Sequence, residues 1–147
     1  MPRGSRRDDV IEATAGDDIQ LGYVIIYAED VEESVTFYER AFGLLRRFVH
    51  ESGAYAEMET GETTLAFVAE ELAALNVPGG YRRNTPGEAP AGVEVVLVSK
   101  DVEDAYRHAV ENGAVPVSSP IEKPWGQVVG YVRDNNGVLV ELATPMG

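Results

Sequence analysis

Short apolar runs and a helical pattern follow one another along this chain in a regular order. Residues 23–28 form a β-rich apolar run, which predicts a strand that ends before the acidic pair at 29–30. Helical spacing predicts an amphipathic helix over 31–42, with Gly43 after its end and an apolar face made of Val31, Val35, Tyr38 and Phe42. Three further strands are expected at about 46–51, 54–59 and 63–68.

The same order returns in the second half of the chain. A strand over 93–98 is followed by a helix that Gly113 ends and by strands at about 115–118, 127–133 and 138–143. The sequence Asp-Val-Glu opens both predicted helices, 71 residues apart, at Asp30 and Asp101. This self-similarity predicts an internal duplication of a βαβββ unit, with modules at about 21–70 and 92–145. We therefore expect an α+β fold in one domain over residues 21–147.

Two segments fall outside the repeat. Residues 69–77 predict a helical turn or two, and residues 78–92 are rich in turn formers and predict a loop, either solvated or a gate over a cleft. Residues 1–20 are polar, charged and contain glycine, which predicts a disordered tail and is unlike a secretory signal.

Composition narrows the functional classes. The chain of 147 residues has no cysteine, which excludes disulfides and thiolate chemistry and fits a cytoplasmic location. A formal net charge of −13 repels phosphate backbones and anionic lipid, so neither nucleic acid nor a membrane is an expected partner. No apolar run approaches the ~20 residues of a membrane span.

The duplication predicts a cleft. Each unit covers one sheet face with its helix, and two units that curve their bare faces toward each other enclose a cavity. Strand alternation assigns Val24, Ile26, Leu65, Phe67, Val95, Leu97, Val140 and Leu142 to the helix side. The same alternation leaves for the cleft Tyr23, Tyr27, Ala66, Glu94 and Glu141, among others.

Three stretches carry a family resemblance: YVIIYAEDVEESVTFYERAFGL, VEVVLVSKDVEDAYRHAVENGA and PWGQVVGYVRDNNGVLVEL. Together with the duplication, they resemble the vicinal-oxygen-chelate (glyoxalase/bleomycin-resistance/dioxygenase) superfamily over about 21–145. The resemblance implies paired βαβββ modules and a homodimer. It also implies, in the enzymatic branches, a divalent metal held by His and Glu on the first and last strands of each module.

The ligand positions that the resemblance implies differ in this chain. Tyr23 stands where metalloenzymes have His, Ala66 where Glu is common, and Glu94 in place of a second His, whereas Glu141 matches. A set without imidazole is expected to bind Zn, Ni or Fe poorly, so the cofactor is either none or a weakly bound divalent metal. A carboxylate-rich alternative from His50, Glu57, Glu94 and Glu141 would suit Mg or Mn, unless these groups are simply solvated or hydrogen-bonded.

Other residues offer further chemistry. Glu94 and Glu141, if they face one cleft, repel each other and could act as a general acid or base, or could hydrogen-bond neighbours and shape the pocket. Trp125 lies between Pro124 and Gly126 in a predicted loop, where it either stacks on a flat ligand or closes the end of the barrel. Further aromatic candidates, which either line the cleft or pack in the core, are Phe48, Tyr55, Tyr81 and Tyr131.

Two functions remain open at this level. The first is a small-molecule-binding protein of the drug-sequestering, antibiotic-resistance type, a homodimer whose cleft takes a small aromatic or cationic ligand. The second is a glyoxalase-like lyase, isomerase or dioxygenase with an atypical metal site or with Glu94 and Glu141 as catalytic acid and base. A regulatory module without a ligand is a third possibility, which a cleft filled by apolar side chains would favour.

Overall fold

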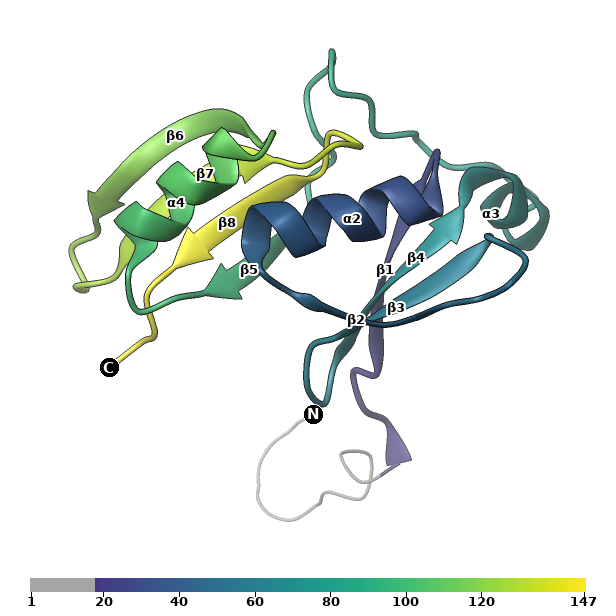
Figure 1. The fold of residues 1–147 in the computed structure, drawn as a ribbon, viewed down its shortest axis with the longest axis horizontal. Helices are drawn as coiled ribbons and strands as arrows, with labels where there is room; N and C mark the ends of the chain where they lie inside the picture. Colours follow the sequence, from purple (N-terminus) through teal and green to yellow (C-terminus); the bar gives the residue numbers. More distant parts are fainter. Residues whose placement is uncertain (1–17) are drawn as a thin grey trace, which may run out of the picture.

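The computed structural model describes residues 18–147, and residues 1–17 of the predicted tail lie outside it. Module 1 consists of β1 (Tyr23–Ala28), α2 (Val31–Phe42), β2 (Leu45–Val49), β3 (Tyr55–Glu59) and β4 (Thr64–Ala69). Module 2 consists of β5 (Glu94–Val98), α4 (Val102–Glu111), β6 (Val115–Glu122), β7 (Val128–Arg133) and β8 (Leu139–Ala143). The short helix α3 (Glu70–Asn76) and a long connector join them (Figure 1). The predicted α+β fold with two βαβββ modules is confirmed.

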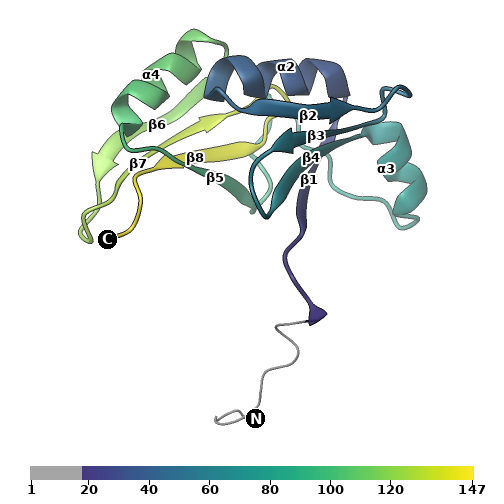
Figure 2. The same ribbon diagram turned by 60° about the horizontal axis from the view of Figure 1, so that its bottom comes forward.

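Each module forms one open four-stranded sheet. The strand orders are β1-β4-β3-β2 and β5-β8-β7-β6, with the first pair parallel and the others antiparallel. Helices α2 and α4 lie side by side on the same side of the two sheets (Figure 2). The opposite side of each sheet is not covered by α2 or α4 and is called the open face below; α3 contacts β4 and β1 of the first sheet. Strands β1 and β5 are edge strands that adjoin in the middle of the molecule.

The helix ends follow the sequence signals. The Asp30 carboxylate accepts a hydrogen bond from the Glu33 backbone N–H at 3.0 Å, which satisfies one of the free donors of the first turn of α2. Asp101 caps α4 in the same way through Asp104. Gly43 ends α2 with a φ of 70°, a conformation that residues with a Cβ rarely adopt.

One strand differs from its predicted length. The sixth strand was expected over 115–118, but β6 runs from Val115 to Glu122. Pro116 and Pro120 cannot donate ladder hydrogen bonds, so the sequence predicts a shorter strand than the structure contains. The strand continues because it lies at the edge of its sheet, where register shifts let Ile121 and Glu122 pair with β7.

One hydrophobic core serves both modules. Val35, Tyr38 and Phe67 of module 1 pack in the same buried cluster as Val132 and Val140 of module 2. A polar contact crosses between the modules inside this core. Tyr38 Oη donates to Asp134 Oδ2 at 2.6 Å, and Asp134 is only 1% exposed. Burial raises the pKa of the Tyr38 hydroxyl well above its usual value, so it stays the donor.

The turn between β7 and β8 is held by the same contact. Asp134 also accepts from the backbone N–H groups of Asn136 and Val138, each at 2.8 Å. The Asn136 amide donates to Ser34 Oγ of α2 at 2.9 Å. This predicted Asp-Asn-Asn-Gly turn therefore also fixes module 2 against α2. No helix within residues 18–147 is long and apolar enough to cross a membrane.

Candidate functional site

The strands divide their side chains between the core and the open faces as the alternation predicts. Seven of the eight residues assigned to the helix side pack in or against the buried cluster, and the eighth, Leu142, is buried at 3% exposure; the seven are Val24, Ile26, Leu65, Phe67, Val95, Leu97 and Val140. Their neighbours in sequence point to the open faces. Tyr23, Ala66, Glu94 and Glu141 lie there at matching positions of the two modules, since Ile25 pairs with Ala66 and Val96 pairs with Glu141.

Two carboxylates meet on the open face of module 2. Glu94 is the first residue of β5, and Glu141 lies on the neighbouring strand β8. The hydrogen bond between them raises the pKa of the Glu94 carboxyl to about 7, and partial burial and the charge of Glu141 act in the same direction. Tyr131 on β7 pairs in register with Glu141, and its pKa is raised by burial and then by a hydrogen bond to Glu141.

On the open face of module 1, one arginine pairs with two carboxylates. Arg47 donates to Glu57 at 2.8 Å and to Glu59 at 3.0 Å, and it also contacts Thr64. Tyr55 donates to the second oxygen of Glu57 at 2.6 Å, as expected from their shared orientation. Burial and this bond raise the pKa of Tyr55 to about 12. Glu57 is thus held by two neighbours and is largely removed from solvent.

Two predicted site residues lie elsewhere. His50 follows β2, and its Nδ1 lies 2.8 Å from Ser52 Oγ in the turn before β3. Trp125 lies in the turn between β6 and β7, is 62% exposed, and donates its indole N–H to Gln127. The C-terminal end of β8 adjoins that turn, whereas Glu94 begins β5 at the other end of the sheet. The structure therefore does not bring Trp125 or His50 to the acidic pair.

The side chains at the expected metal-ligand positions do not fit the divalent metal that the family resemblance implies. Across residues 18–147, no three His, Asp or Glu side chains converge in a way that could hold an ion. The alternative set of His50, Glu57, Glu94 and Glu141 is not brought together, because Arg47 and Tyr55 hold Glu57 and His50 lies in a turn. Glu94 and Glu141 remain as two carboxylates with Tyr23 and Ala66 at the matching positions, a set without the imidazole that such metals prefer.

A groove follows the line where β1 and β5 adjoin, and we call it the seam. Its larger cavity, about 440 Å³, is lined by β5 and by residues near the start of β1 and β4. Its smaller cavity, about 260 Å³, lies between β1, the start of β5 and the connector. Glu94 lines both cavities, so this member of the acidic pair lies where the two halves of the seam meet. Tyr27 lines the smaller one.

One contributor to this region, Arg47, is not among the candidates predicted from the sequence, although the alternation from Phe48 and Val49 could have placed it near the open face. Tyr81 is a predicted aromatic candidate, and its ring packs on Tyr27 with centroids 4.7 Å apart. No local signal indicates that contact, because it joins the connector to a strand more than fifty residues earlier.

Comparisons with known proteins agree with this fold. Residues 20–142 match the Glyoxalase/Bleomycin resistance protein/Dioxygenase superfamily. The uncharacterized protein YraH of Bacillus subtilis is 26% identical over 125 residues, which cover 84% of this chain and 97% of that protein.

Solved structures resemble the chain at lower identity. A glyoxalase-related enzyme from Fulvimarina pelagi has a TM-score of 0.73 at 19% identity, with 86% of this chain and 88% of that chain covered. TioX from Micromonospora sp. ML1 has a TM-score of 0.64 at 20% identity, with 85% and 98% covered. At such identities the structures support the fold alone.

Proposed function

This chain belongs to the glyoxalase/bleomycin resistance/dioxygenase superfamily, and from that membership and its open faces we propose that it is a small-molecule-binding protein of the sequestering type. The observation that carries the proposal is the acidic pair of Glu94 and Glu141 at the seam, beside exposed apolar side chains of Ile25 and Val96. Such a surface combines apolar area with a localised negative charge. It suits an amphipathic organic cation, as many antibiotics are.

The electrostatics favour a cation over a neutral ligand. Close carboxylates repel each other when both are ionised, and a proton relieves that repulsion at Glu94. A bound ammonium would relieve it in the same way and would gain a charge-assisted hydrogen bond. Antibiotic self-resistance by sequestration in the cytoplasm is the physiological role that we propose.

A second copy of the chain is part of this proposal. Tyr23, Ile25, Val96 and Val98 are exposed on the open faces, and an interface with another protomer would cover them and enclose the groove. We propose a homodimer. Light scattering after size exclusion should give twice the mass of the chain, and a monomer at micromolar concentration would contradict it.

The binding proposal is tested by calorimetric titration with cationic aromatic antibiotics of the bleomycin type at pH 8. We expect saturable binding that Glu94→Gln weakens about tenfold, since a charge-assisted hydrogen bond contributes about 1.5–3 kcal/mol. Glu103→Gln, on the exposed first turn of α4, is the matched control and should bind like the unchanged protein. Equal affinity in Glu94→Gln would contradict the role of the pair, and no binding of any cation would contradict the function.

A raised carboxyl pKa also favours a second candidate function. A group with a pKa of about 7 is suited to exchange protons at neutral pH, so Glu94 could serve as the acid or base of an isomerase or lyase. Nuclear magnetic resonance of candidate ligands incubated with the protein in D₂O detects such proton exchange directly. Deuterium incorporation that Glu94→Gln abolishes would support the enzyme, and an unchanged ligand spectrum would support sequestration.

A further inference from the structure

The two halves of the seam differ in what covers them. The larger cavity opens between the sheets, whereas the smaller one has the connector as its roof, with Tyr81, Arg82, Asn84 and Ala91 among its lining residues. Figure 1 shows this segment arching from α3 over to β5. The connector therefore gives the smaller cavity a wall that the larger cavity lacks.

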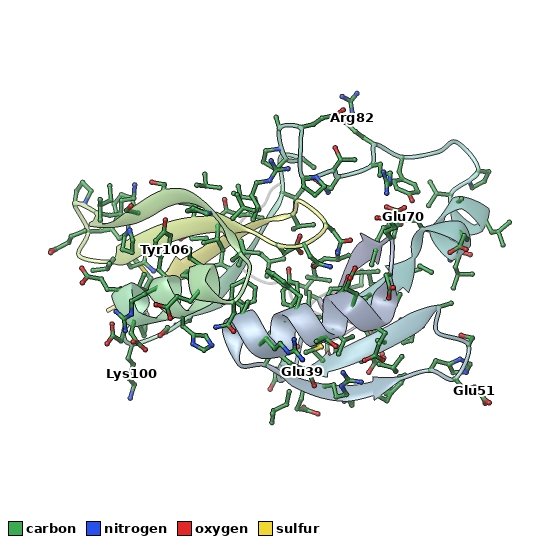
Figure 3. The ribbon with its side chains drawn as sticks, turned by 45° about the horizontal axis from the view of Figure 1, so that its top comes forward. Glu39, Glu51, Glu70, Arg82, Lys100 and Tyr106 are labelled. Atoms are coloured by element: carbon green, nitrogen blue, oxygen red, sulfur yellow. The ribbon has the colours of Figure 1, made fainter. Side chains whose placement is uncertain are left out.

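The roof is fastened to the body at three places. The Tyr81 ring packs edge to face on Tyr27, with centroids 4.7 Å apart and planes at 70°. Arg83 pairs with Glu70 at 2.8 Å, and in Figure 3 Glu70 lies beneath the arch. The Arg133 guanidinium donates to the backbone carbonyl of Thr85 at 3.0 Å. These contacts hold the connector over the cavity.

The lining gives the cavity a defined chemistry. Val24, Ile26, Val93 and Val95 supply apolar walls, and Tyr27 and Tyr81 supply aromatic surface. Of its two carboxylates, Glu70 is neutralised by Arg83, whereas Glu94 shares its proton with another acid. Arg82 also lines the cavity, so its negative charge is local to Glu94, at the end where the cavity meets the open half of the seam.

We propose that the cavity under the connector binds the aromatic ring of a small organic amine, with its ammonium group at Glu94 and with Tyr81 closing the cavity. This inference rests on the proposed binding function and names the class and position of the ligand. The volume of about 260 Å³ admits a one-ring or two-ring molecule. Ring contact with the tyrosines and the charge at Glu94 together select an aromatic cation over a neutral analogue.

The test uses 2-phenylethylamine and its neutral analogue 2-phenylethanol, titrated into the full chain and followed by backbone amide resonances. We expect the amine to bind at least about tenfold more tightly, because a charge-assisted hydrogen bond is worth about 1.5–3 kcal/mol. Its largest shifts should fall at Tyr81, Asn84 and Glu94. Equal affinities for the two compounds would overturn the assignment of an amine.

Variants of Tyr81 in the connector test whether the aromatic ring of the amine binds beneath it. Tyr81→Ala should weaken amine binding about fivefold to tenfold, as expected when an aromatic contact of about 1 kcal/mol is lost. Tyr81→Phe keeps the ring and should bind like the unchanged chain, which also guards against a folding defect in Tyr81→Ala. Leu75→Ala removes an 80% exposed side chain from α3 and serves as the matched control.

The outcomes separate this inference from the function on which it rests. Unchanged affinity in a folded Tyr81→Ala variant would overturn the site under the connector while leaving the sequestering function intact. The same holds if large antibiotics bind and the amine does not. If neither the amine nor any antibiotic binds, both proposals are overturned.

Discussion

The two modules share a fold but treat charge on their open faces in opposite ways. In module 1, Glu57 lies opposite Ala66 and is held by Arg47 and Tyr55. In module 2, the matching positions are Tyr131 and Glu141, and the second carboxylate, Glu94, stands where module 1 has Tyr23. Within residues 18–147, neither Glu94 nor Glu141 forms an ion pair with Arg, Lys or His.

This difference indicates how a duplicated unit can divide its roles. The polar groups of module 1 satisfy one another and cover their own sheet, so Ala66 is 0% exposed despite lying on the open face. Module 2 leaves its charge at the seam, where a ligand can reach it. The open face of module 1, whose carboxylates pair with Arg47, contributes to stability. The open face of module 2, whose carboxylates have no cationic partner within residues 18–147, is available for binding.

The largest loss of stability is expected when the carboxylate of module 2 is introduced at the matching position of module 1. Ala66→Glu would insert a carboxylate into a fully buried position opposite Glu57, and overpacking and charge burial together should lower the free energy of unfolding by about 3 kcal/mol or more. Urea denaturation measures it. The reverse change, Glu141→Ala, removes a partly exposed side chain and should cost less than about 1 kcal/mol. Similar costs for the two changes would contradict the asymmetry.

Removing Arg47, the cation on the open face of module 1, should lower stability by a smaller amount. Arg47→Ala deprives the buried Glu57 of its partner and should destabilise the protein by about 1–2 kcal/mol. Its neighbour offers a control, because Arg46 pairs only with Glu32 and Glu39, which are more exposed. Arg46→Ala should therefore cost about 0.5 kcal/mol. Thermal unfolding of both variants decides this, and equal losses would show that Glu57 does not depend on Arg47.

The smallest effect concerns pH. Because the pKa of Glu94 is raised from 4.5 to about 7, the folded protein binds an extra proton between these values, and stability falls as the pH rises through that window. Glu141→Gln removes the repulsion, so its Tm relative to the unchanged protein should increase from pH 5 to pH 8. Carbon-detected titration should show the pKa of Glu94 moving back toward its usual value. A constant difference in Tm across this range would contradict the coupling.

Local patterns in the sequence predict much of the fold. The spacing of Val31, Val35 and Tyr38 predicts α2, and the alternation in β1 and β5 predicts which side chains enter the core. The repeat of Asp30 and Asp101 predicts the duplication, because each carboxylate caps a helix within its own turn. These features depend on neighbours close in sequence, which the chain displays directly.

The candidate site is predicted less completely. Alternation alone places Glu94 and Glu141 on one face, yet it does not show that Arg47 neutralises Glu57 or that Tyr81 reaches Tyr27. Those contacts depend on where a bulged strand and a long connector lie in space, and no periodic pattern encodes either. Trp125 is a further example. Its place between Pro and Gly predicts a loop correctly, but it does not predict how far that loop lies from the acidic pair.

The hydrogen bond between Tyr38 and Asp134 has a consequence for how the protein is synthesised. Its partners are 96 residues apart, so the helix that carries Tyr38 leaves the ribosome long before its acceptor exists. Until the last hairpin is translated, the nascent first module must keep this hydroxyl hydrated and its helix face incompletely packed. Long-range closure of this kind slows folding, and it makes the completed chain, rather than either repeat, the unit that folds.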